Sequence, residues 1–206
     1  VRRTDLGFEA SSAWPTIFVI DPHPRKPHMF SWLQVDPADD LWLIAEGQLD
    51  GDPAQVRQKV DEIESSLGLE IAQRLMDPNM GASPSSATRG RTWQREFEEA
   101  GIVCDLAIDS DVGRGRINEY LRPDARTLRP RLHFHSRCYN AAFQMKRYTW
   151  SEFRRADEKD LKEKPRDKWD DWPTMLKYAL NADPSFSILR HGAPVVRRFG
   201  NRRGGR

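Results

Sequence analysis

The sequence predicts an α/β protein with a mixed central sheet, in which a three-stranded antiparallel meander continues into parallel strands and helices flank both faces. Three observations lead to this fold class. Apolar runs follow one another closely at residues 16–21, 28–36 and 40–48, with Pro and Asp between them, which is typical of strands joined by turns. Apolar residues then recur at helical spacing in segment 52–68. Beyond it, extended and helical segments alternate, as they do in parallel strands joined by crossover helices.

Segment 52–68 carries both a start signal and a stop signal for a helix. Asp52 is an N-cap residue type and Pro53 suits the first turn, while Gly68 ends the periodic pattern. The apolar residues at helical spacing are Val56, Val60, Ile63 and Leu67. We therefore expect one amphipathic helix to follow the meander.

The same signals assign the remaining elements. They predict a fourth strand at 70–77, a loop in "PNMGASPSSATRG", a helix in "RTWQREFEEAG", a fifth strand in "IVCDLAI", helices at 112–122 and 136–148 with "RLHFH" extended between them, and a last helix at 170–181. Segment 152–168 is nearly all charged residues of mixed sign, which indicates an exposed connection. This order of elements is that of the ribonuclease H-like fold.

The length of 206 residues suits one large domain. We expect a linker at 1–15, the ribonuclease H-like domain at 16–183, and a basic, flexible tail at 184–206. After Asp183 the chain has no acidic residue but six arginines, a composition typical of a solvated tail that can contact phosphate. The net charge of the whole chain, +2, is too small to indicate a nucleic-acid binder by itself.

Cysteine usage and hydropathy exclude several classes. Cys104 and Cys138 are far apart in apolar contexts, which favours buried thiols over a disulfide framework or a zinc site and predicts a reducing, cytoplasmic compartment. No apolar run approaches the roughly 20 residues of a membrane span.

Two aspartates end predicted strands. Asp21 and Asp77 are each followed by Pro, which ends strand pairing and exposes the carboxylate. The first and fourth strands are neighbours in the expected sheet, so these like charges would lie side by side and raise the pKa of one aspartate unless a cation compensates them. Mg²⁺ prefers such oxygen ligands. The alternative for each residue is an ordinary Asp-Pro turn.

The segment "KWDDWPTML" supplies further carboxylates. Pro173 is tolerated only in a first helical turn, which places Asp170 near the N-cap and Asp171 at the helix entrance. The alternative is that both residues only cap the helix. Three converging carboxylates would form a two-metal site with ions about 4 Å apart.

Five segments together resemble one known family. "IDP", "MDP", "FEEAGIVCDLA", "CYNAAFQMKRYTW" and "DDWPTMLKYAL", in this order over residues 17–180, are similar to the C-terminal nuclease domain of the large terminase subunit of tailed bacteriophages. The resemblance implies cleavage of double-stranded viral DNA with little sequence preference during genome packaging in the host cell cytoplasm. It also implies two Mg²⁺ or Mn²⁺ ions.

By this resemblance the catalytic, metal-binding aspartates are Asp21, Asp77 and Asp171, and Asp170 is a further metal ligand. Many relatives have His and then Asp one turn apart in the last helix, whereas this chain has Asp171 and Thr174. The resemblance implies as partners the portal, the small terminase subunit and an ATPase domain. No Walker A sequence occurs in the chain, so the ATPase is expected outside it.

Several other residues are candidates for DNA contact or metal binding. The DNA-binding candidates are Arg89, Arg91, Arg114, Arg116 and His23. The arginines lie beside glycines, although generic surface charge explains them almost as well. His23 lies between two prolines next to Asp21, where it would contact phosphate or orient a metal-bound water unless it is a solvated loop residue. Glu46 ends a strand beside the first and is a reserve metal ligand.

Two other functions fit the same sequence. One is a Holliday-junction resolvase or transposase-like nuclease of the same fold. The other is a non-catalytic module that grips DNA or docks on a portal, with aspartates that only cap and turn.

Overall fold

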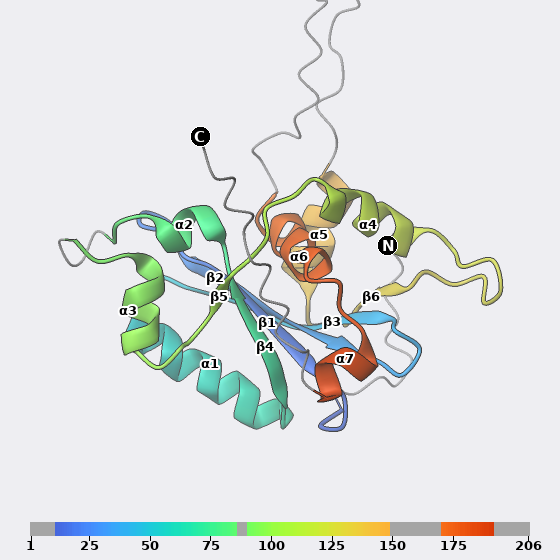
Figure 1. The fold of residues 1–206 in the computed structure, drawn as a ribbon, viewed down its shortest axis with the longest axis horizontal. Coiled ribbons are helices and arrows are strands. Elements are labelled where there is room, and N and C mark those ends of the chain that lie inside the picture. Colours follow the sequence, from blue (N-terminus) through green and yellow to red (C-terminus); the bar gives the residue numbers. More distant parts are fainter. Residues whose placement is uncertain (1–10, 86–89, 149–169, 192–206) are drawn as a thin grey trace, which may run out of the picture.

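A computed structural model describes residues 11–85, 90–148 and 170–191 as one six-stranded sheet with helices on both faces (Figure 1). The strands are β1 (Thr16–Asp21), β2 (His28–Val35), β3 (Leu41–Leu49), β4 (Ile71–Met76), β5 (Asp105–Leu106) and β6 (Leu132–Phe134). The helices are α1 (Pro53–Leu67), α2 (Pro78–Ala82), α3 (Trp93–Glu99), α4 (Val112–Leu121), α5 (Tyr139–Arg147), α6 (Asp171–Asn181) and α7 (Phe186–His191).

The sheet has the strand order β5-β4-β1-β2-β3-β6. β1, β2 and β3 pair antiparallel as a meander. β4 lies parallel to β1, β5 parallel to β4, and β6 parallel to β3. The predicted fold class, a mixed sheet that combines a meander with parallel strands, is therefore confirmed.

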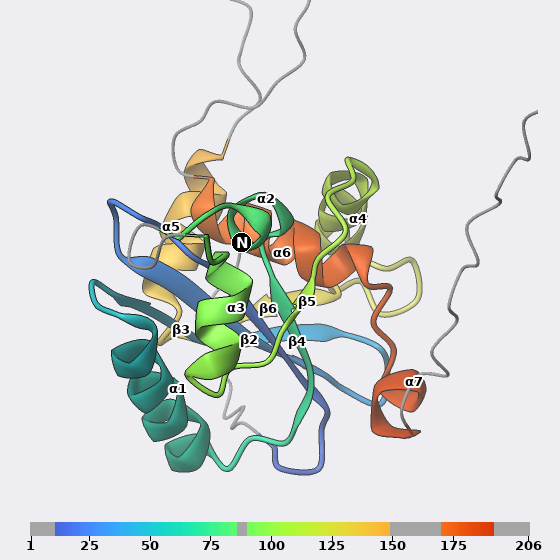
Figure 2. The same ribbon diagram turned by 60° about the vertical axis from the view of Figure 1, so that its left-hand side comes forward.

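Side chains of the central strands alternate between two hydrophobic cores. Ile17 and Val19 of β1 pack with α4, α5 and α6, whereas Phe18 and Ile20 pack with α1 and α3 on the opposite face. Figures 1 and 2 show these two helical layers on either side of the sheet. Because both faces are covered, every residue of β1 is buried, and such strands read as continuous apolar runs.

Helix α1 ends where its sequence signals predict. Asp52 and Gln55 form a reciprocal capping box at the N-terminus, and Gly68 adopts a left-handed conformation at φ 60° that L side chains adopt rarely. Glu64 of α1 also ties the helix to the sheet. Its carboxylate accepts hydrogen bonds from Trp32 Nε1 at 2.9 Å and from both terminal nitrogens of Arg74 at 2.8 and 2.7 Å.

Helix α4 crosses α6 closely at one glycine. A Cβ atom on Gly113 would lie 2.6 Å from the backbone oxygen of Lys177 and 2.8 Å from the side-chain oxygen of Asn181. Real Cβ atoms essentially never make contacts this short, so the crossing requires glycine at this position.

The structure differs from the prediction at the sheet edge and in the loops. The fifth strand is two residues long rather than seven, because Val103 and Ile108 are 64% and 62% exposed and only β5 itself pairs with β4. Helix α2 forms inside a predicted loop. Helix α7 lies in the predicted tail, where the Phe186 N–H donates to Asp39 Oδ1 at 2.7 Å. Segment 152–168 and residues 192–206 lie outside the described residues.

Both cysteines are buried and unlinked, as the sequence predicts. The Cys138 thiol donates to the Leu43 carbonyl at 3.3 Å. Within the described parts of the chain, no helix combines the length and the apolar character needed to cross a membrane.

Two glycine substitutions test the packing. Gly47→Ala would place a methyl group 2.2 Å from the ring of Phe30, so we expect a loss of about 1–3 kcal/mol in the free energy of unfolding. Gly115→Ala in α4 meets open space and should gain about 0.5–1 kcal/mol, since alanine favours helix. Urea denaturation measures both. An unchanged urea midpoint for Gly47→Ala would contradict this expectation and show that β3 or the Phe30 ring moves to accommodate the methyl group.

Candidate metal centre

The parallel pairing of β1 and β4 brings Asp21 and Asp77 to the same end of the sheet. The Asp77 N–H donates to the Ile20 carbonyl at 2.9 Å, directly beyond the last paired residues of the two strands. Both aspartates follow the two-residue period of Val19 and Leu75, which pack on the α6 side of the sheet. The predicted adjacency of the two strand ends is therefore confirmed.

Helix α6 brings the other predicted carboxylates to this end. Asp171 is its first residue, and Pro173 lies in its first turn, where proline is tolerated. Trp172, Leu176 and Ala179 are buried, as expected for the face toward the core. Asp170 occupies the N-cap position without a capping hydrogen bond from its side chain.

An open pocket of about 280 Å³ collects these side chains. It is lined by Asp21, His23, Lys26, Asp77, Asn79, Met80, Asp170, Asp171 and Thr174. The structure thus brings together all four aspartates that the sequence singled out as metal ligands, although Asp21 and Asp171 are 150 residues apart in the chain.

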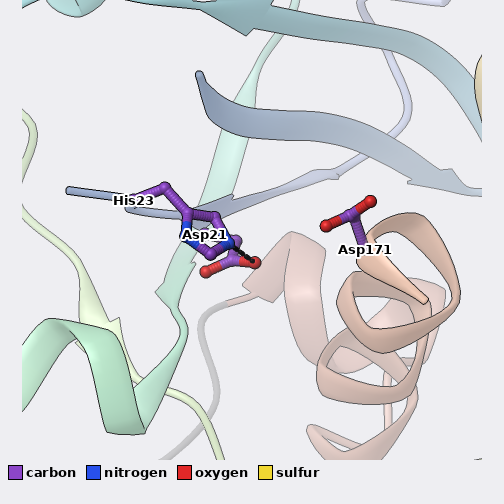
Figure 3. Close-up of side chains that lie close together, drawn as sticks. All are labelled: Asp21, His23 and Asp171. Carbon is purple, nitrogen blue, oxygen red and sulfur yellow. Dashed lines mark ion pairs between the residues drawn. The ribbon is translucent and has the colours of Figure 1, made fainter. Parts of the chain in front are cut away.

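Three of the lining residues form a tighter group. Ligand atoms of Asp21, His23 and Asp171 all lie within 4.8 Å of one another, and Figure 3 shows them at the end of β1, in the loop that follows it, and at the start of α6. His23 Nε2 is 3.7 Å from Asp21 Oδ2. Burial and the nearby Lys26 lower the pKa of His23, which favours its neutral form. From its place in the sequence, His23 is a candidate for DNA contact or for orienting a metal-bound water.

The Asp21 carboxylate lies in an environment that disfavours its charge. It is 7% exposed, and its Oδ1 has no hydrogen-bond partner among the described residues. Burial, followed by the charges of Asp77, Asp171 and Asp170, raises its pKa to about 8. An unpaired buried oxygen surrounded by carboxylates fits a divalent cation, which would supply the missing charge and coordinate this oxygen.

Asp77 has features of both roles that the sequence left open, a residue of a local Asp-Pro turn and a ligand in the pocket. Its Oδ1 accepts the Met80 N–H at 2.7 Å and caps α2, while its Oδ2 accepts a hydrogen bond from the Tyr178 hydroxyl. Burial and this hydrogen bond raise the pKa of Tyr178. Asp77 is therefore a helix cap that also lines the pocket, and it lies outside the group of three.

Sequence reasoning missed the residues that support this arrangement. Asp171 Oδ2 accepts from Gln144 Nε2 at 2.8 Å, and Gln144 Oε1 accepts the Trp172 N–H at 3.1 Å. Beside the pocket, the buried Lys177 forms an ion pair with Asp109, which also accepts from Asn79 Nδ2 at 3.3 Å. The glutamine and the lysine occur in ordinary helical patterns, so no local signal marks them.

Glu46 binds backbone N–H groups of α5 rather than facing the pocket. Its two oxygens accept the N–H groups of Asn140 and Ala141, each at 2.7 Å. It therefore holds the first turn of α5 against β3. It does not line the pocket with Asp21 and Asp171, for which the sequence makes it a reserve metal ligand.

Of the arginines considered for DNA contact, the three that the structure describes, Arg91, Arg114 and Arg116, do not line the pocket either. Arg91 pairs with Glu99, and Arg114 of α4 pairs with Asp111. Arg116, also in α4, has an internal role. It donates to the Leu180 carbonyl at 2.6 Å and pairs with Asp183 at 3.0 Å. Arg89 lies outside the described residues, and DNA contact by these side chains stays a prediction.

No family model and no curated protein matches the sequence, but solved structures match its fold. The nuclease domain of the P22 large terminase superposes with a TM-score of 0.62 at 16% identity, covering 89% of this chain and 90% of that chain. The fold is that of a large terminase nuclease domain.

Two other terminase structures agree. The nuclease of the large terminase from thermophilic phage G20c has a TM-score of 0.52 at 12% identity, with 83% of each chain covered. The large terminase of a second thermophilic bacteriophage gives a TM-score of 0.60 at 13% identity and covers 82% of this chain. This chain spans 39% of the length of that second protein.

The raised pKa of Asp21 predicts a pH-dependent stability in metal-free protein. The folded-state pKa, about 8, exceeds the unfolded value near 3.9, so stability falls as pH rises between these values. Asp21→Asn removes the ionisable group and therefore abolishes this fall in stability with rising pH. In EDTA it should unfold several degrees above wild type at pH 8, equivalent to a few kcal/mol, and the difference should shrink at pH 5.

The exposed Asp105→Asn is the matched control for thermal unfolding, and it should leave the melting temperature unchanged at both pH values. An Asp21→Asn protein that melts below wild type at pH 8 would contradict the electrostatic account of the pocket.

Proposed function

We propose that this chain is a metal-dependent endonuclease that cleaves double-stranded viral DNA, with little sequence preference, during genome packaging. One observation carries the proposal: the buried, unpaired oxygen of Asp21 lies among further carboxylates at the ends of adjacent parallel strands. The fold shared with terminase nuclease domains supports the same function.

Asp21, Asp77 and Asp171 are the residues that would hold two Mg²⁺ or Mn²⁺ ions, with Asp170 beside them. Bound divalent ions supply an activated water and neutralise charge during phosphodiester hydrolysis. The chain's own residues perform the positioning. Gln144 orients the Asp171 carboxylate, and Tyr178 with the Met80 N–H fixes that of Asp77.

A basic side chain at the pocket would attract the substrate. Lys26, in the loop between β1 and β2, lines the same pocket as the carboxylates. Its ammonium group favours a phosphate of the DNA backbone, a contact that is independent of base sequence. Such a contact fits cleavage with little sequence preference.

The proposed partners follow from the packaging role. Because the chain spans only 39% of the large terminase from the second thermophilic phage, we assign the packaging ATPase, the portal and the small terminase subunit to the wider assembly in which this nuclease acts. The substrate itself is double-stranded DNA.

Plasmid cleavage tests the activity. With Mn²⁺ or Mg²⁺ the wild-type chain should nick and linearise supercoiled DNA, and EDTA should stop it. Asp21→Asn should lower the rate on the order of 100-fold or more, because it removes charge from the centre that holds both ions. The exposed Asp105→Asn should cleave at the wild-type rate. Undiminished cleavage by Asp21→Asn would falsify the assignment.

The same assay separates the alternatives. A preference for four-way junctions over linear duplex would indicate a resolvase-like nuclease, and metal-independent DNA binding without cleavage would indicate a docking module.

Paired substitutions at the start of α6 distinguish the two neighbouring aspartates. Asp171 belongs to the tight group with Asp21, whereas Asp170 lines the same pocket outside that group. Asp171→Asn should therefore reduce cleavage at least tenfold more than Asp170→Asn, as measured at saturating metal. Equal losses would mean that both carboxylates contribute to the centre to the same extent.

A further inference from the structure

His23 lies where a ligand of a metal ion would lie. It follows Asp21 by two residues, and its Nε2 is 3.7 Å from Asp21 Oδ2. This separation, marked in Figure 3, allows an ion pair when His23 is protonated but is longer than the 2.7–3.2 Å of a hydrogen bond. Asp171 completes the group within 4.8 Å.

The backbone at His23 is anchored. Its N–H donates to His28 Nδ1 at 3.0 Å, and His28 Nε2 lies 3.0 Å from the Gly51 carbonyl. Because the carbonyl can only accept, His28 Nε2 carries the proton and Nδ1 is free to accept. His28 is 3% exposed, and its ring packs edge-on against Trp93 and Phe97. A rigid group therefore holds the loop that presents His23.

A second observation points to a ligand between these side chains. Asp21 Oδ1 is buried and has no hydrogen-bond partner in the part of the chain that the structure describes. Buried carboxylate oxygens are otherwise almost always satisfied. A cation between Asp21, His23 and Asp171 would satisfy this oxygen and offset the clustered negative charge.

We propose that His23, with Asp21 and Asp171, is a direct ligand of one divalent ion, and that its imidazole makes this centre favour Mn²⁺ over Mg²⁺. This proposal rests on the proposed function, because it takes the ion bound by His23 to be one of the two ions of the nuclease. It assigns His23 to metal binding rather than to DNA contact.

The chemistry of the ligand set gives the preference. Mg²⁺ is bound almost entirely through oxygen, with several retained waters. Imidazole is a ligand of transition ions, and Mn²⁺ is the transition ion that shares the preference of Mg²⁺ for carboxylate ligands. A mixed set of two carboxylates and one imidazole therefore suits Mn²⁺ better than Mg²⁺. Asp77 lies outside the group of three, so a second ion held by Asp77 would not have His23 among its ligands. The two ions therefore occupy unequal sites, and only one of them depends on His23.

Pulsed EPR of bound Mn²⁺ reads the coordination directly. We expect the wild-type chain, stripped with EDTA and loaded with one equivalent of Mn²⁺, to show ¹⁴N coupling from a coordinated imidazole. His23→Gln should lack this coupling. His135→Gln is the matched control, because His135 does not line the pocket, and it should retain the signal.

Calorimetry with the same proteins measures selectivity. His23→Gln should weaken Mn²⁺ binding on the order of tenfold or more, since even an outer residue of a metal site contributes about that much. Binding of Mg²⁺ should change about threefold or less, because its preferred ligands are the remaining oxygens. Equal losses for both ions would overturn the proposed preference.

Failure of this inference is distinguishable from failure of the nuclease assignment. Absence of ¹⁴N coupling in the wild type, while Asp21→Asn abolishes cleavage, would overturn the role of His23 and leave the nuclease intact. Coupling that disappears in His23→Gln without any DNA cleavage would support the ligand and reject the nuclease. The wild-type spectrum decides the matter even if His23→Gln folds poorly.

Discussion

The confinement of like charges at one end of the sheet is the constraint on which the rest of the structure depends. Parallel pairing of β1 and β4 fixes where Asp21 and Asp77 emerge, and α6 covers that end with Asp171. Burial removes the water that would otherwise screen these carboxylates, so the metal-free centre opposes folding. The surrounding packing must therefore supply the free energy that holds them together.

Helix α6 supplies much of that packing. Residues Trp172, Met175 and Leu176 are at most 3% exposed and join the core formed with β1 and β2. Burial of a large apolar side chain is worth about 1.5–3 kcal/mol, so a few such residues offset the repulsion in the pocket. This end of the sheet is thus stabilised by the apolar side of the same helix that carries one of the pocket carboxylates.

Local signals explain which parts could be predicted from the sequence. The meander and α1 follow from apolar periodicity and caps such as Asp52 and Gly68, and Pro173 placed Asp171 at a helix entrance. The proximity of His23 to the carboxylates depends on its bond to His28, which in turn depends on the Gly51 carbonyl. Contacts of this kind join residues that are distant in the chain, so they produce no periodic pattern in the sequence. The brevity of β5 likewise reflects tertiary exposure rather than its apolar composition.

The close crossing of α4 over α6 fixes the position of α6 at a residue without a side chain. Gly113 meets the backbone of α6 at Lys177, between Asp171, which faces His23, and Tyr178, which holds Asp77. Asp171 and Tyr178 are seven positions apart in α6, which is about 10 Å along the helix axis. A bulkier residue at position 113 would shift or tilt α6, and Asp171 and Tyr178 would then move together. The geometry of the pocket is thus governed in part by a point of contact that lies outside its lining.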